Sequence, residues 1–244
     1  MMGATPMDDR PEIPHEPEAI SDLPEPPEAP LPSSPDPVWE PIAVLTAVHA
    51  ALLWATGSHD PERLVEVGAL TGWPPAAEAY RLVTANFLHA DLAHLAVNTA
   101  YLVVFGLAAI RLFGLSWSAL AYAVGAVASS AASVLIVPWH IPSVGSSGCV
   151  FALAGATIAG RLRLAAVSRL PRRERWRLAG LAGVLASGAL SANWAAHLGG
   201  ALAGSVLGAL LPFAGSGSPG AARLAGAAGL AALVLPWAWR IASP

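Results

Sequence analysis

The stretch GSSGCVFALAGATIAGRLR, residues 145–163, opens with two serine hydroxyls and continues as an apolar run. Its length is close to the roughly 20 residues that cross a bilayer. Only a helix satisfies its own backbone hydrogen bonds in hydrocarbon, so this run predicts a membrane helix that begins near Ser147. A second stretch, AHLGG at residues 196–200, places His197 at the start of another apolar run. Hydrocarbon penalises an unpaired hydroxyl or imidazole, so both side chains are expected to have a partner or a function.

The whole chain has the composition of a multi-span membrane protein. Of its 244 residues, 55% are hydrophobic and only 12% are charged, and the mean hydropathy is +0.56. All 13 basic residues are arginine, and they form no basic face outside one loop, which argues against nucleic acid as a partner. The single cysteine, Cys149, excludes an intramolecular disulfide and is expected to be a small core residue.

Seven apolar runs define the expected architecture: about 38–57, 92–113, 115–138, 147–163, 177–193, 195–212 and 221–241. They predict an all-α polytopic membrane protein with six transmembrane helices in a domain over 38–212. Residues 213–244 are expected to form a linker and a seventh transmembrane helix. Residues 1–37 contain eleven prolines and nine acidic residues, which predicts a disordered acidic tail.

Seven arginines within residues 161–177 fix the expected orientation. The positive-inside rule places this loop in the cytoplasm. Counting spans from it puts the 1–37 tail in the cytoplasm and makes 58–91 a long, structured external loop. The second, fourth and sixth spans then all begin on the external side.

This topology brings polar residues from three spans to one depth. His94 and Asn98, Ser147 and His197 each lie within roughly 10 Å of the external end of their helix. Small residues recur every fourth position along the fourth and sixth spans, as in Gly200 and Gly204, and such stripes let helix backbones approach closely. Close approach of these two spans would bring Ser147 to His197, although ordinary packing explains either stripe alone.

These residue types suit peptide-bond hydrolysis. A serine becomes a nucleophile when a histidine takes its proton. Free backbone N–H groups at the start of the Ser147 helix can stabilise an oxyanion, and Gly145 and Gly148 permit close substrate approach. His94 and Asn98 are four residues apart, hence on one helix face, and can donate hydrogen bonds to the same oxygen.

The three spans contain no carboxylate, so a Ser–His dyad is expected rather than a triad. Some other group must therefore orient the imidazole of His197. Phe151 lies one turn after Ser147 on the same face, where its ring can stack on that imidazole.

At these positions the chain resembles the rhomboid family of intramembrane serine proteases. The matching segments are GSSG at 145–148 with Phe151, Ala196-His197 with Gly200 and Gly204, FLHADLAHLAVN at 87–98, and RLVT at 81–84. The resemblance covers about 38–212. The chain departs from the family pattern at Tyr80, where tryptophan is common, and at Phe151, where some members have tyrosine.

The resemblance implies that Ser147 is the nucleophile and His197 the general base. His94, Asn98 and the backbone N–H of Ser147 would form the oxyanion hole. Members cleave transmembrane substrates near a helix end and use no metal or cofactor. We therefore expect an endopeptidase of the bacterial plasma membrane that acts on single-span membrane proteins at the external side of the bilayer.

Several alternatives stay open at this point. Ser147 can be an ordinary helix-start serine, Ser146 can be the nucleophile instead, and His94 and Asn98 can be hydrogen-bonding contacts between helices. A catalytically inactive rhomboid-like protein that binds membrane clients is the chief rival function. A zinc protease is disfavoured because His-Glu-x-x-His is absent, and a transporter because duplicated halves with broken helices are absent.

Overall fold

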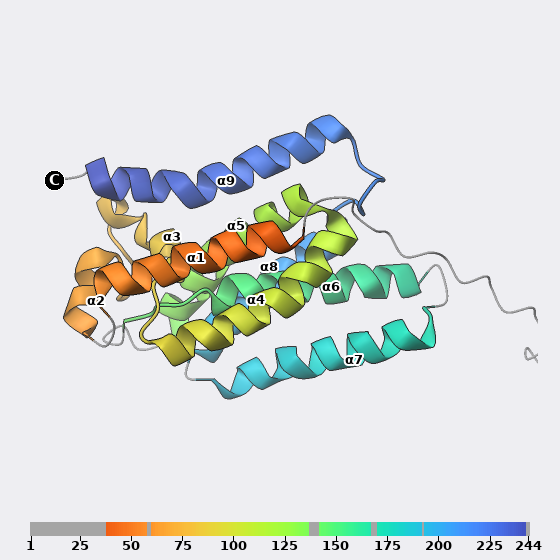
Figure 1. The fold of residues 1–244 in the computed structure, drawn as a ribbon, viewed down its shortest axis with the longest axis horizontal. Coiled ribbons are helices and arrows are strands. Elements are labelled where there is room, and N and C mark those ends of the chain that lie inside the picture. Colours follow the sequence, from red (N-terminus) through yellow and green to blue (C-terminus); the bar gives the residue numbers. More distant parts are fainter. Residues whose placement is uncertain (1–37, 58–59, 137–141, 167–169, 192, 243–244) are drawn as a thin grey trace, which may run out of the picture.

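The chain is a membrane-type bundle of helices in the computed structural model, which describes residues 38–57, 60–136, 142–166, 170–191 and 193–242 (Figure 1). Strand-like pairing within these ranges is confined to one isolated bridge between Leu70 and Ser143. The predicted all-α polytopic fold is confirmed. The expectation of a disordered 1–37 tail lies outside the described residues.

The long helices coincide closely with the predicted spans. They are α1 (Trp39–Thr56), α4 (Leu92–Phe113), α5 (Leu115–Ile136), α6 (Ser147–Ala165), α8 (Trp194–Leu210) and α9 (Pro219–Ala242). All but α8 are long and apolar enough to cross a bilayer, and α8 is an apolar helix of 17 residues. The run at 221–241 thus forms a helix of transmembrane length, α9.

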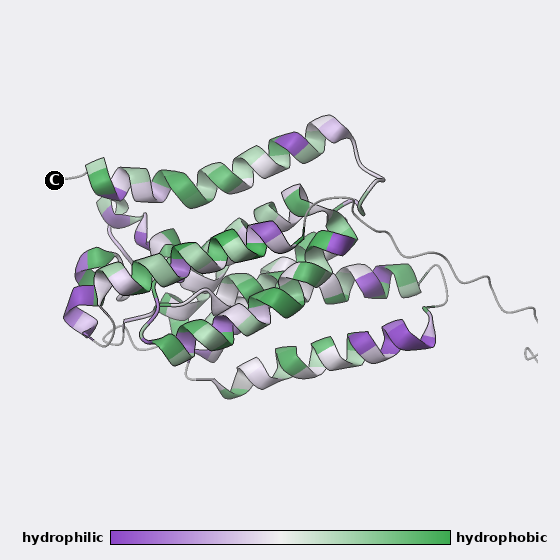
Figure 2. Cartoon of the chain, viewed as in Figure 1, coloured by the Kyte–Doolittle hydropathy of each residue, from purple (hydrophilic) through white to green (hydrophobic). Residues whose placement is uncertain are grey.

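The helix in the fifth span differs from its prediction. It is α7 (Arg172–Ser187), which begins five residues before the expected start at 177 and passes into a 3-10 turn, η4 (Gly188–Leu190). Its first two turns carry five of the chain's charged residues. Arginine residues are compatible with a helix because their long side chains let the guanidinium groups reach water. The helix therefore extends beyond its apolar part. Figure 2 shows this hydrophilic start of α7 at one end of the bundle.

The described part of the expected loop, residues 60–91, is structured and contains α2 (Pro61–Val67), η2 (Ala76–Glu78), α3 (Arg81–Thr84) and η3 (Ala85–Phe87). Arg81 holds it together: its Nη1 donates to the carbonyl oxygens of Val65 at 2.5 Å and Ala69 at 3.0 Å. The segment also contacts α9, because Trp239 Nε1 donates to the Ala77 carbonyl at 3.3 Å. The C-terminal helix is therefore packed against the loop.

Helix α6 lies at the centre of the bundle, between α4, α5 and α8 (Figure 1). Its span is 67% buried inside the protein, against 11% for the span of α9. The glycine stripe of α8 faces α6: a Cβ at Gly200, Gly204 or Gly208 would collide with the α6 backbone. The two helices thus pack backbone to backbone, which fixes the relative position of their first turns.

Candidate active site

Ser147 and His197 meet at the starts of two neighbouring helices. Ser147 is the first residue of α6, and His197 lies in the first turn of α8. The Oγ of Ser147 is 2.8 Å from Nε2 of His197. Both line an open cavity of about 290 Å³, together with His94 and Asn98 of α4. The residues expected at one depth are therefore gathered around one space.

The imidazole of His197 is oriented from its other nitrogen. Its Nδ1 lies 3.0 Å from the Gly188 carbonyl oxygen and 2.9 Å from Ser191 Oγ. A carbonyl can only accept, so this contact assigns the proton to Nδ1 and leaves Nε2 free to accept from the Ser147 hydroxyl. The turn after α7 thus supplies the orienting groups that sequence reasoning left unnamed. Neither the Gly188 carbonyl nor Ser191 has a local sequence signal that distinguishes it from other loop residues.

The ring of Phe151 is stacked on the imidazole of His197. The ring centroids are 4.2 Å apart and the planes are inclined by 9°. Phe151 is fully buried, so the stack forms one wall of the site. Gly188 lies against the edges of both rings, because a Cβ there would collide with the Phe151 ring and stand 3.0 Å from His197 Nδ1. The imidazole therefore has little freedom to rotate away from Ser147.

Backbone and side-chain donors converge just before α6. Gly145 has φ +113°, and a Cβ there would stand 2.7 Å from the His94 ring and 3.3 Å from Asn98 Nδ2. Only glycine permits this backbone next to those side chains. Asn98 is 2% exposed, and its Nδ2 has no hydrogen-bond partner among the described residues. A buried, unsatisfied donor beside a helix N-terminus is suited to receive an oxyanion.

Ser146 and Ser147 differ sharply in access. Ser146 is 1% exposed, whereas Ser147 lines the open cavity. A nucleophile must reach a substrate, so burial disfavours the neighbouring hydroxyl as the attacking group.

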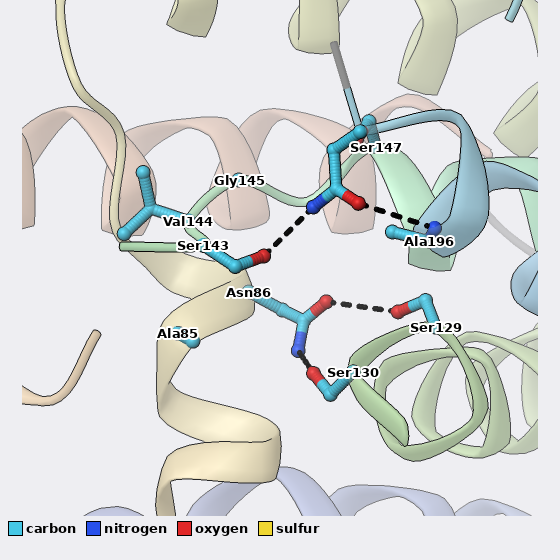
Figure 3. Close-up of a pocket in the computed structure, with 10 residues that line it drawn as sticks. Ala85, Asn86, Ser129, Ser130, Ser143, Val144, Gly145, Ser147 and Ala196 are labelled. Atoms are coloured by element: carbon cyan, nitrogen blue, oxygen red, sulfur yellow. Dashed lines mark hydrogen bonds between the residues drawn. The ribbon is translucent and has the colours of Figure 1, made fainter. Parts of the chain in front are cut away.

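A small polar pocket of about 10 Å³ lies on the other side of Ser147 (Figure 3). Asn86 of η3 donates to Ser130 Oγ at 3.0 Å and accepts from Ser129 Oγ at 3.3 Å. Asn193, the N-cap of α8, donates to Ser143 Oγ at 2.8 Å. The volume is about that of one water molecule. Sequence reasoning missed this pocket, whose residues come from segments far apart in the chain.

His89 lies in the loop just before α4 and is fully buried. Its ring centroid is 5.0 Å from that of His49 and 5.3 Å from that of His94. Burial, and to a smaller extent the neighbouring His49 and His94, lower the pKa of His89 to about 3. His89 is thus neutral near pH 7 and packs the loop against α1 and α4.

The family model described as Rhomboid domain matches residues 76–212, which span all the elements of this site. Rhomboid protease GluP of Bacillus subtilis is 38% identical over 103 residues, which is 42% of this chain and 20% of that protein. Rhomboid-related protein 3 of Mus musculus is 39% identical over 83 residues, or 34% of this chain and 20% of that protein. Rhomboid-like protein 11, chloroplastic, of Arabidopsis thaliana is 33% identical over 142 residues, 52% of this chain and 51% of that protein. The matched part of the chain thus spans between a fifth and a half of these relatives.

Proposed function

The chain belongs to the rhomboid family, and from this premise we propose that it is an intramembrane serine endopeptidase. In this proposal Ser147 is the nucleophile and His197 is the general base. The observation that carries it is the 2.8 Å contact between Ser147 Oγ and His197 Nε2 at the edge of an open cavity.

The reaction follows from the donors and acceptors around these two residues. Ser147 Oγ attacks the substrate carbonyl carbon while His197 Nε2 takes the hydroxyl proton. The carbonyl oxygen becomes negative and receives hydrogen bonds from the Ser147 backbone N–H, Asn98 Nδ2 and the His94 ring. His197 then gives its proton to the leaving amine, which breaks the peptide bond and leaves an ester on Ser147.

Hydrolysis of that ester requires a water molecule in a largely apolar protein. The pocket lined by Asn86, Ser143 and Asn193 adjoins Ser147 and offers hydroxyl and amide partners for one water. His197, again neutral, takes a proton from this water as it attacks the ester carbon. The ester bond to Ser147 then breaks, the Ser147 oxygen takes the proton from His197, and the carboxyl product is released. No step requires a metal or cofactor.

Single-span membrane proteins are the proposed substrates. The open cavity is lined by apolar Val97 and Val144 and by the aromatic ring of Tyr101 as well as by the polar site residues, so it suits an unwound segment of an apolar helix. The arginine-rich end of the bundle is assigned to the cytoplasm by the positive-inside rule, which places cleavage near the external face. The proposed location is the bacterial plasma membrane, with the N-terminus in the cytoplasm.

The alternative is a rhomboid-like protein that binds membrane clients without cleaving them. Such a protein needs neither an attacking hydroxyl nor a base. This chain has both, in hydrogen-bonding contact, so cleavage is the favoured function.

The decisive experiment uses purified protein in liposomes with a panel of single-span reporter substrates. We expect Ser147→Ala to reduce cleavage by at least about 10³-fold, because removal of a nucleophile leaves only binding and oxyanion stabilisation. Ser146→Ala is the matched control and should cleave like the parent. Equal rates for Ser147→Ala and the parent would show that the nucleophile is misassigned. If the parent binds reporters but cleaves none, the client-binding function holds instead.

A further inference from the structure

A second cavity lies at the end of the bundle opposite Ser147. It has a volume of about 450 Å³ and lies between α4, α6 and α7. Its wall has two parts, one apolar and one cationic. The apolar part consists of Val104, Leu107, Ala108, Leu181 and Val184, and the cationic part consists of Arg111, Arg161 and Arg177.

The cations outnumber the anions around this cavity. Arg161 is 9% exposed and is ion-paired with Glu174, which also accepts from Arg177 Nη1 at 2.6 Å. The Nε of Arg161 has no hydrogen-bond partner in the part of the chain that the structure describes. Arg111 has no ion-pair partner within that part either. Three guanidinium groups therefore line the cavity, and the one carboxylate beside them, Glu174, pairs with two of the three, Arg161 and Arg177. The formal charge of these four side chains is +2.

The depth of the cavity matches a membrane–water boundary. Arg111 follows Asn98 by 13 residues on α4, which is about 20 Å along a helix axis. Arg161 follows Ser147 by 14 residues on α6, a similar distance. The hydrocarbon core of a bilayer is about 30 Å thick, so the arginines lie near the face opposite the candidate active site. From there the apolar wall extends toward the bilayer centre.

We propose that this cavity binds a phospholipid with an anionic headgroup. Its phosphodiester contacts the guanidinium groups of Arg111 and Arg177, with Arg161 behind them, and an acyl chain lies along Val104 and Val184. Arginine matches the geometry of phosphate oxygens through paired N–H donors. Basic pockets between transmembrane helices are a known form of anionic lipid recognition.

A transmembrane peptide fits this cavity less well. The ends of membrane spans on the arginine-rich side carry an excess of lysine and arginine, which the three guanidinium groups would repel. A zwitterionic headgroup would bring an ammonium group into the same positive field. Charge therefore favours a lipid with net negative charge over both.

The test measures binding of dioleoyl phosphatidylglycerol to the purified full chain by native mass spectrometry, with dioleoyl phosphatidylcholine as the neutral-headgroup comparison. The double variant Arg111→Gln/Arg177→Gln removes two cavity cations and leaves the buried Arg161–Glu174 pair intact. The matched control is Arg172→Gln/Arg175→Gln, which removes two exposed cations from the same end of α7 that do not line the cavity. Thermal unfolding of all three proteins checks that the variants are folded.

We expect the cavity variant to bind phosphatidylglycerol about thirtyfold more weakly than the parent, equivalent to about 2 kcal/mol for two cations. The control variant should stay within about threefold, and phosphatidylcholine should bind all three proteins equally weakly. Equal loss in both double variants would mean diffuse surface charge and would overturn the site. Displacement of the lipid by millimolar inorganic phosphate would show a site for a free anion, and displacement by a transmembrane peptide would show a peptide site. Either result would overturn the lipid assignment.

Discussion

Substituting Gly204 with alanine tests whether backbone packing of α8 on α6 positions the two reactive side chains. Gly204 lies seven residues after His197, two turns further along α8. A Cβ at this position would lie 2.6 Å from the carbonyl carbon of Ala152 and 2.7 Å from its Cα, whereas ordinary contact begins at 3.4 Å. The obstacle is backbone, which has no rotamer to change. The helices must therefore separate by about 0.8 Å to clear the carbonyl carbon, and by more to clear the Ala152 carbonyl oxygen, which lies nearer still.

The displacement acts directly on the 2.8 Å contact between Ser147 Oγ and His197 Nε2, because each residue lies in the first turn of one of the two helices. A misplacement of about 1 Å can cost about 10²-fold in rate. Overpacking also costs about 1–3 kcal/mol of stability. We expect Gly204→Ala to lower the cleavage rate by about 10- to 100-fold while the protein stays folded in detergent.

The assay is reporter cleavage in liposomes, with labelling of Ser147 by a fluorophosphonate as a second readout that needs no substrate. Gly183→Ala on α7 is the matched control, since its added Cβ meets no atom within 4 Å. The control should cleave and label like the parent. If Gly204→Ala cleaves and labels at the parent rate, close contact between α6 and α8 does not determine the reactivity of Ser147.

Two further predictions concern stability. Glu174→Ala leaves the buried Arg161 guanidinium without its carboxylate, so we expect the free energy of unfolding to fall by about 3 kcal/mol. The control Glu66→Ala breaks an exposed pair with Arg63 and should cost under about 1 kcal/mol. Equal losses in thermal unfolding would contradict the burial argument. For His89, the unfolded state takes up a proton near pH 6.5 while the folded state resists protonation until about pH 3, so acid favours unfolding. The parent should therefore lose about 2 kcal/mol more than His89→Leu between pH 7 and pH 5, and parallel pH profiles would contradict a neutral His89.

The fold was largely predictable because a helix that spans a membrane needs an apolar run of a set length, which is visible in the sequence. The helices α4, α5 and α6 begin within one residue of their predicted starts, and the glycines of α8 face α6 as their spacing predicted. The start of α7 was wrong by five residues, because the prediction treated the arginines as loop while their aliphatic stems are compatible with a helix. Hydropathy locates the apolar part of a helix but not its charged end.

Residues of the candidate site could be predicted from the sequence only where they differ from their surroundings. Ser147 and His197 are polar residues at the starts of apolar runs, so they can be identified from the sequence alone. The Gly188 carbonyl is a backbone group with no sequence signature, and Ser191 resembles any loop serine. Asn86 and the serines of α5 become a pocket only once η3 and α5 lie side by side. Groups of this kind can be assigned to the site only from their contacts in the folded structure, and a single sequence contains no information on those contacts.

The Gly188 carbonyl gives a physical reason why the proposed dyad suits this environment better than a triad. A carboxylate beside His197 would have to be ionised in a largely apolar bundle, where desolvation of a charge costs several kcal/mol. A carbonyl oxygen accepts the Nδ1 proton with no net charge to desolvate, and the stacked Phe151 ring limits rotation of the imidazole. In the proposed mechanism, the missing charge means weaker stabilisation of the imidazolium that would form when His197 takes the serine proton. Orientation of the His197 imidazole by a neutral carbonyl and an aromatic ring thus makes the site easier to assemble within the membrane. The cost is a slower proposed reaction, because the imidazolium is less well stabilised.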